Sequence, residues 1–391
     1  MSSQQIQALE SEKIPKLLFH YALPAVVGTA VNSLYNIVDR IFIGNGVSEY
    51  ALSGLAITFP ILIFLMAFGM LVGAGASVRV SILLGRKDIK EAEHTLANAI
   101  FLTFFTQALT IIPCYIFMEP LLRLFGASER TLPYAMEYLQ YVVPANIFSA
   151  LSFGFNAIMR ASGYPRKAMI TMIIGAMTNV VLDYIFIYPL GMGISGAAIA
   201  TVISMIVCSV YVLSHFFRKD SIVRFHRSAF RLSLPVISGI TAIGVAPFAM
   251  HLTGSLVNII MNRSFVSYGE TADATDLAIG AFGIINGYAM LFFMIIIGVA
   301  QGMQPIVGFN YGAKNPGRVK SAYRYSCGVN LLVSFLGFAL AMLMPRTIVS
   351  LFTNSEQMIE LSASALRTAL IGLSLVGFQV TTTQFFQSIG F

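Results

Sequence analysis

Polar residues recur inside the first long apolar segment of the chain. They are Asn32, Tyr35, Asn36 and Asp39, followed at once by Arg40. Spacings of three and four residues place such side chains on one face of a helix, so that face must meet something polar. If the segment crosses a membrane, burying a carboxylate there costs about 2.5–3.5 kcal/mol unless it faces a cavity or a partner. Asp39 could pair with Arg40 or a neighbouring helix, but we favour a cavity-facing carboxylate that binds a cation or a proton.

A second polar group lies in two later apolar segments. Asn179 and Asp183 are four residues apart in the fifth segment, and Thr201 lies in the sixth. At 1.5 Å per residue, Asp39, Asp183 and Thr201 lie about 7, 9 and 12 Å from their outer helix ends, a similar depth in a bilayer. Two carboxylates, an amide and a hydroxyl suit a hard cation such as Na⁺, and the carboxylates could instead share a proton. Asn179 and Thr201 could also be ordinary hydrogen-bonding contacts between helices.

The candidate site residues follow from these two groups. The predicted cation- or proton-coupling residues are Tyr35, Asn36, Asp39, Asn179, Asp183 and Thr201. If the ion is Na⁺, the expected metal ligands are Asp39, Asn179, Asp183 and Thr201. Asparagines inside the apolar segments are weaker candidates for lining a substrate cavity: Asn32, Asn156, Asn258, Asn262 and Asn286.

The composition indicates that these residues belong to a membrane protein. Of the 391 residues, 57% are hydrophobic and only 10% are charged, against about 25% charged in soluble domains. The net charge of +7 comes from basic residues in short loops, so it indicates how the chain is oriented across the membrane. It does not predict a nucleic-acid partner. The first 14 residues contain Glu10 and Glu12 and lack the basic start of a signal peptide, so none is expected. All three cysteines fall in apolar segments without a metal-binding spacing, which disfavours disulfides and zinc.

Hydropathy predicts ten membrane-spanning helices. Their expected ranges are about 15–43, 51–82, 93–117, 133–161, 167–189, 194–217, 235–267, 277–308, 320–344 and 360–389. Basic residues concentrate in every second loop, namely 86–90, 160–167, 218–231 and 314–324. By the positive-inside rule these loops are cytoplasmic, which also places the N-terminus in the cytoplasm. We therefore expect an all-α, multi-pass protein of the plasma membrane.

The chain also repeats itself. A shift of 227 residues superposes 51–164 on 278–391, and a shift of 223 aligns Pro24 with Pro247. This predicts two pseudo-symmetric lobes at 1–217 and 235–391, joined by a linker at 218–234 and related as parallel repeats about an axis along the membrane normal.

The two predicted lobes are unequal. The first has six helices and the second four, so we expect ten spans of a full set of twelve, through truncation or through an incomplete lobe; we favour truncation. Asn262 stands at the position equivalent to Asp39, and the spans of the second lobe have no central acid. The acids that we predict to bind a cation or a proton therefore lie in the first lobe.

Several segments together resemble one family, the multidrug and toxic compound extrusion (MATE) transporters, and within it the MepA-like and DinF-like bacterial branch. The matching pieces are Val38 to Gly44, Leu84 to Asp88, Met159 to Gly163, Asn179 to Asp183 and Gly196 to Thr201. The resemblance implies twelve helices and an antiporter that expels amphipathic, often cationic drugs in exchange for H⁺ or Na⁺. It also implies a cation site in the first lobe at Tyr35, Asp39, Asn179, Asp183 and Thr201. Another branch keeps coupling acids in the second lobe, and the spans present here have none.

The expected function is therefore cation-coupled multidrug efflux by alternating access. A lipid-linked or polysaccharide flippase with the same two lobes is the main alternative, although it should line its cavity with several Arg or Lys side chains. A membrane receptor is less favoured because of the internal repeat. The chain has no phosphate-binding loop and no nucleophile–base pair, so we expect neither an enzyme nor a cofactor beyond the coupling ion. The expected partners are drugs and membrane lipid, and the expected state is a monomer.

Overall fold

A computed structural model of the chain describes residues 2–268, 272–352 and 355–391; within these ranges, the side chains of 2–4, 49, 227, 255, 258–259, 261–280 and 357 are left out. In the described part, nine helices are long and apolar enough to cross a membrane, and a bent pair makes a tenth span. The helices are α1 (Ser2–Ser11), α2 (Ile14–Gly46), α3 (Glu49–Gly85), α4 (Ile89–Ile116), α5 (Met118–Leu124), α6 (Leu132–Ala161), α7 (Pro165–Ile187), α8 (Gly193–Phe217), α9 (Leu234–Tyr268), α10 (Ala272–Gly312), α11 (Pro316–Leu343), α12 (Pro345–Ser350), α13 (Glu356–Ala369) and α14 (Leu373–Ser388). The prediction of an all-α membrane protein is confirmed.

The tenth predicted span is broken. Instead of one helix over 360–389, α13 and α14 meet at a bend of 46°. Gly372 lies at this break, and glycine weakens helix continuation because its backbone has the most freedom to lose. The equivalent position in the first repeat is Ala145, inside the continuous helix α6. Three shorter helices, α1, α5 and α12, were not predicted.

The helix bounds repeat along the chain. Adding 227 to the bounds of α4 gives those of α11, and the short helices α5 and α12 follow them in the same order. Lys87 and Lys314, 227 residues apart, both have positive φ, at 63° and 56°. The following residues, Asp88 and Asn315, accept hydrogen bonds from backbone N–H groups at the starts of α4 and α11. We call α2–α8 the N-terminal lobe and α9–α14 the C-terminal lobe; the sequence-based limits of the lobes and their linker stay a prediction.

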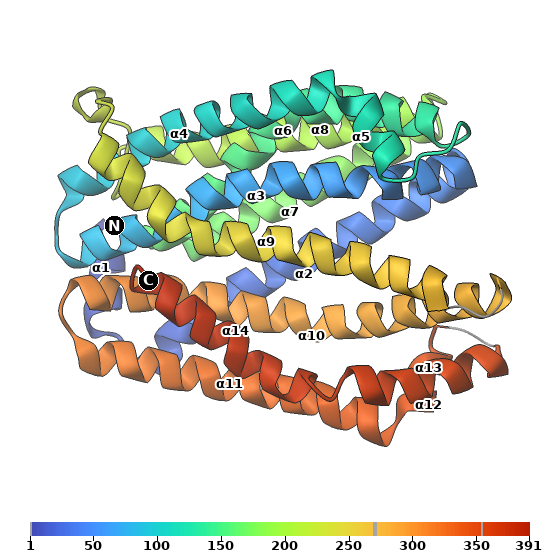
Figure 1. Cartoon of the computed structure of the whole chain (residues 1–391). Helices are drawn as coiled ribbons and strands as arrows, with labels where there is room; N and C mark the ends of the chain where they lie inside the picture. The colour runs from blue at the N-terminus through green and yellow to red at the C-terminus, as the bar shows by residue number, and fades with distance from the viewer. Residues whose placement is uncertain (1, 269–271, 353–354) are drawn as a thin grey trace.

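Glycines allow the lobes to approach each other closely. A Cβ atom at Gly244 of α9 would lie 1.8 Å from the carbonyl oxygen of Leu71 in α3. On a second helix pair, a Cβ atom at Gly302 of α10 would lie 2.6 Å from the Cα atom of Ala22 in α2. Figure 1 shows α9 running beside α3, and α2 running obliquely between the two groups of helices.

Contacts between the lobes lie toward one end of the molecule. That end carries α1 and both chain ends, and we call it the α1 face (Figure 1). At mid-length of the helices, the Thr29 hydroxyl donates to the Met294 carbonyl oxygen at 3.2 Å, and the rings of Phe68 and Phe248 are 4.9 Å apart. Beyond these contacts, large apolar side chains on α2 and α9 are exposed: Leu34, Ile37, Ile41, Leu256, Val257 and Ile260. In the described part of the chain, the lobes therefore pack together on the side of the α1 face, and apolar side chains of α2 and α9 are exposed in the halves of these helices that lie away from it.

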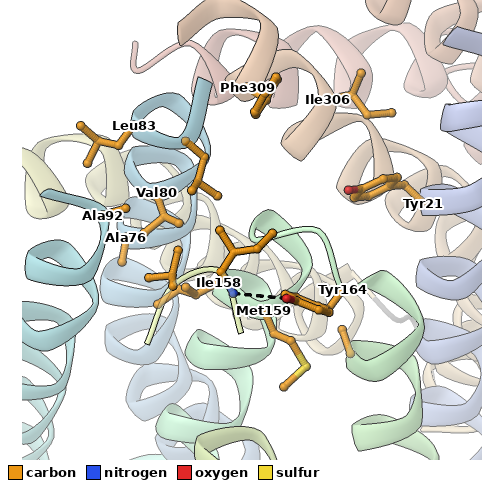
Figure 2. Packing of buried hydrophobic residues seen from close by; sticks show 14 of the residues in the cluster. Tyr21, Ala76, Val80, Leu83, Ala92, Ile158, Met159, Tyr164, Ile306 and Phe309 are labelled. Carbon is orange, nitrogen blue, oxygen red and sulfur yellow. Dashed lines mark hydrogen bonds between the residues drawn. The ribbon is translucent and has the colours of Figure 1, made fainter. Parts of the chain in front are cut away.

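A buried apolar cluster lies near the α1 face and draws on both lobes. Figure 2 shows Val80 of α3 and Phe309 of α10 among its side chains. The Tyr164 hydroxyl donates to the carbonyl oxygen of Asp220 at 2.7 Å. It also accepts from the N–H of Ile222 at 3.2 Å, the bond drawn as a dashed line in Figure 2. Burial raises the pKa of Tyr164 to about 12, so the hydroxyl remains protonated and able to donate at neutral pH. This pair of bonds fixes the segment after α8 to the N-terminal lobe.

Candidate cation site

Three helices of the N-terminal lobe position the candidate residues. The helix α7 packs against both α2 and α8. At the first contact, a Cβ atom on Gly28 would lie 2.6 Å from the sulfur of Met172; at the second, one on Gly175 would lie 2.3 Å from the Cys208 sulfur. The Cys208 thiol also donates to the Thr171 carbonyl oxygen at 3.4 Å. Small residues at these contacts bring the polar stripes of the three helices into one region.

The two acids of these stripes face each other in the protein interior. Asp39 is 8% exposed and Asp183 is fully buried. Their carboxyl groups are close enough to interact electrostatically, and a hydrogen bond between them requires that one of them carries a proton. The guanidinium of Arg40 instead stacks over the ring of Phe59 at 4.7 Å, and Arg40 is exposed. Among the ion pairs of the described residues, none joins Arg40 to Asp39.

The oxygens of this region are short of hydrogen-bond donors. Within the described part of the chain, buried side-chain oxygens without a hydrogen bond include Oδ1 of Asp39, Oδ1 of Asn179 and both carboxylate oxygens of Asp183. A buried acceptor left without a partner costs roughly 1–3 kcal/mol, and more when it is charged. Four such oxygens from three residues form an arrangement that a cation or added protons would satisfy.

Hydroxyl and amide groups surround the acid pair. The Asn179 amide donates to the Thr201 hydroxyl at 3.4 Å. Tyr35 adjoins Asp39, while the Asn36 amide donates to the carbonyl oxygen of Asn32 in the same helix at 2.6 Å. The geometry thus brings together the polar groups of α2, α7 and α8 that the depth calculation had placed at one level.

Sequence reasoning missed one member of this site, Tyr138 of α6. Its side chain is 5% exposed, and its hydroxyl approaches Thr201 and the two carboxyl groups. Tyr138 lies six residues after the start of α6 at Leu132, about 9 Å at 1.5 Å per residue, so the same depth calculation would have found it.

A small cavity of about 90 Å³ opens beside the site. Tyr35 and Thr201 belong to both the site and the cavity wall, together with Asn32 and Asn156. The rest of the lining is Ser149, Ser152, Phe153, Thr171, Met172, Gly175, Ala176, Ser204, Met205 and Cys208. None of these lining residues is an acid or a base of the Asp, Glu, Lys, Arg or His type. The volume is enough for a few water molecules, since one needs about 10–15 Å³ of such space.

The five candidate cavity asparagines therefore separate into groups. Asn32 and Asn156 line the cavity, and the Asn156 amide also donates to the Ala168 carbonyl oxygen at 2.7 Å. Asn286 is exposed on α10 in the other lobe. Asn258 and Asn262 lie in α9, but their side chains are outside the described residues.

Comparison with known proteins settles the family. The MatE family model matches residues 24–185 and 248–391, two stretches that include most of α2, of α7 and of both lobes. The chain belongs to the MatE family. This MatE protein is 26% identical to the multidrug export protein MepA of Staphylococcus aureus strain MSSA476 over 393 residues, covering 100% of this chain and 85% of the relative. MepA of Staphylococcus haemolyticus is also 26% identical, with the same coverage.

Solved structures of MatE relatives share its fold. A multidrug resistance MATE transporter in an outward-facing conformation matches with a TM-score of 0.89 at 26% identity, covering 98% of this chain and 84% of that one. A MOP superfamily transporter from Pyrococcus furiosus matches with a TM-score of 0.90 at 27% identity and the same coverage. The resemblance read from the sequence motifs is thus confirmed, and this MatE protein belongs to a family of membrane transporters with two helical lobes.

Proposed function

We propose that this protein exports amphipathic, often cationic drugs across the bacterial inner membrane in exchange for H⁺ or Na⁺. The curated relatives named above are multidrug export proteins, which supports the choice of substrate class. The chain offers a buried acid pair for the driving ion. In this proposal the α1 face is cytoplasmic, as the basic loops indicate.

One observation carries the coupling part of the proposal: the buried oxygens without donors on Asp39, Asn179 and Asp183. Two carboxyl groups in a buried site cannot both stay ionised without a compensating positive charge. Either one proton shared by the pair or one Na⁺ held by the carboxylate, amide and hydroxyl oxygens provides that charge. The site can therefore exist in an empty and a loaded form that differ in charge by one unit.

The loaded and empty forms differ in how they hold α2. Asp39 lies on α2, which packs against α7 within the lobe and against α10 of the other lobe. When a cation joins Asp39 to Asp183, repulsion between the two acids is replaced by attraction toward α7. A change in α2 that also disfavours the drug makes the two ligands compete, and such coupling is necessarily reciprocal. Alternating opening of the two faces then converts ion entry into drug exit.

The lining of the cavity disfavours the flippase alternative. A carrier of lipid-linked phosphates should offer several Lys or Arg side chains. The cavity beside the acid pair is lined by hydroxyl, amide, thiol and apolar groups instead. The phosphate-carrier hypothesis therefore receives no support from this cavity.

The proposal is tested by ethidium efflux from proteoliposomes under an imposed pH gradient or an imposed Na⁺ gradient. We expect one gradient to accelerate efflux, and Asp39→Asn to abolish that acceleration. The matched control is Asp88→Asn, because Asn315 already performs the equivalent capping role in the second repeat. Absence of flux under both gradients would refute drug antiport, and a fully active Asp39→Asn variant would remove this acid from the coupling.

A further inference from the structure

The short helix α1 lies at the α1 face and contacts both lobes. It spans Ser2–Ser11 and leads directly into α2. A helix of ten residues is unstable alone in water, because nucleation is costly. Leu9 is nevertheless 1% exposed and belongs to the buried cluster that the two lobes share, and Ile6 packs against the same cluster. Tertiary contacts therefore hold α1 in place.

The C-terminal lobe binds the end of α1. The carbonyl oxygen of Leu9 accepts hydrogen bonds from the Asn310 amide at 3.3 Å and from the Arg318 guanidinium at 3.0 Å. The last carbonyls of a helix have no partner within the helix and carry its negative dipole end, so a guanidinium there is well placed. Arg318 is itself oriented by a bond from its Nε to Oδ1 of Asn310 at 2.9 Å.

The N-terminal lobe holds the other side of the same helix. Glu10 forms an ion pair with Lys87 at 3.2 Å, in the loop between α3 and α4. Earlier in α1, Gln5 lies against Gly163, where an added Cβ atom would be 3.0 Å from the Cβ of Gln5. Gly163 has a φ of 98°, in the loop between α6 and α7. One ten-residue helix therefore joins two loops of one lobe to two helices of the other.

We propose that α1 is a latch that keeps the α1 face closed and must release Leu9 and its carbonyl before the lobes can part there. The inference rests on the proposed alternating access, because a latch matters only if the lobes move. The bonds to Arg318 and Lys87 cannot both persist when the lobes separate, since one short helix cannot follow both. Release of α1 also frees the start of α2, the helix that carries Asp39.

The test measures the separation of the lobes by electron paramagnetic resonance. Spin labels are placed at Lys90→Cys and Lys320→Cys, exposed positions near the starts of α4 and α11, after the three native cysteines are replaced. Leu9→Asp is compared with Gln7→Asp, an exposed position on the same helix. We expect the population at longer distances to increase about 5- to 100-fold in Leu9→Asp and to stay unchanged in Gln7→Asp.

A milder variant protects the test against misfolding. Arg318→Gln removes the charged donor and keeps Leu9 buried, so it should shift the same population in the same direction by a smaller factor. Unchanged distance distributions in Leu9→Asp and Arg318→Gln would overturn the latch. Ethidium efflux on the same proteins separates the two proposals: efflux with unchanged distances refutes the latch alone. A shift in distances in these variants, together with no gradient-driven efflux by the spin-labelled protein with Leu9 and Arg318 intact, supports the latch and refutes the proposed drug antiport.

Discussion

Replacing Asp183 by asparagine should stabilise the protein while abolishing the proposed cation-coupled drug export. Asp183 is fully buried, and neither of its carboxylate oxygens accepts a hydrogen bond within the described part of the chain. Asparagine has nearly the same shape, carries no charge and brings an N–H₂ group toward the carboxyl group of Asp39, whose Oδ1 has no hydrogen-bond partner. The variant therefore removes a buried charge and supplies a donor at the same place.

The size of the effect follows from these unpaired atoms. Leaving one buried polar atom unsatisfied costs about 1–3 kcal/mol. The new amide satisfies at least one oxygen, and the loss of one acid ends the repulsion between the pair. With roughly 2–4 °C of melting temperature per kcal/mol in domains of 150–250 residues, and less in a longer chain, we expect a rise of about 2–6 °C. Cation-driven ethidium efflux should meanwhile fall to the level of protein-free liposomes.

A thiol-reactive fluorescent dye suits the thermal measurement. The chain contains no tryptophan, so intrinsic indole fluorescence gives no signal. Cys114 and Cys327 are buried free cysteines, one in each lobe, and become reactive on unfolding. A lower melting temperature in Asp183→Asn than in the unaltered protein would refute the reasoning, because it would mean that the acid pair is satisfied in the native state. Asp88→Asn serves as the control and should leave the melting temperature and efflux unchanged.

Three further variants examine the lobe contact, the site and the first span. Gly244→Ala adds a Cβ atom 1.8 Å from a carbonyl oxygen of Leu71, so labelling of cysteines introduced between the lobes on the α1 face should increase several-fold. Gly328→Ala, whose added Cβ atom meets no other atom within 4 Å, should not change it. Tyr138→Phe removes a hydroxyl beside the acid pair and should weaken cation binding about tenfold, equivalent to about 1.4 kcal/mol, measured as the ion concentration for half-maximal efflux. Pro24→Ala restores the backbone donor that proline lacks inside α2. The variant should stiffen the helix and slow ethidium efflux several-fold without lowering the melting temperature. Unchanged efflux would show that transport does not need α2 to bend at this position.

The sequence allowed the acid pair to be located because membrane helices are long and span a layer of fixed thickness. Counting residues from helix ends therefore gives depth, and Asp39, Asp183 and Thr201 share one level. Tyr138 lies at a similar depth but was not considered, because a tyrosine near the end of an apolar segment is commonly an interfacial anchor. Whether these residues bind the coupling ion stays a prediction, and proximity in the folded chain makes it testable.

Other features depend on contacts that no local pattern reveals. The first 11 residues are too few and too polar to form a stable helix alone, so α1 follows from its burial against both lobes. The sequence also did not predict the break near Gly372, because glycine is frequent in membrane helices that stay continuous. The equal spacing of α4 and α11, in contrast, was already present in the 227-residue repeat.

The oblique helix α2 connects the acid pair with the contact to the opposite lobe, so a tilt of this helix would move both. Its hydrogen bond from Thr29 to Met294 lies at mid-length, with Asp39 on one arm and the contact of Ala22 with Gly302 on the other. Ten residues separate Thr29 from Asp39, about 15 Å of helix, so a tilt of about 10° around Thr29 would move the carboxylate end by about 2.6 Å. The arm toward Ala22 is about 10 Å long, and the same tilt would move it by roughly 2 Å in the opposite direction. Because Ala22 and Gly302 are in close contact, a displacement of that size would change their packing. The proposed cation binding at Asp39 and the lobe contact at Gly302 would then be coupled through α2.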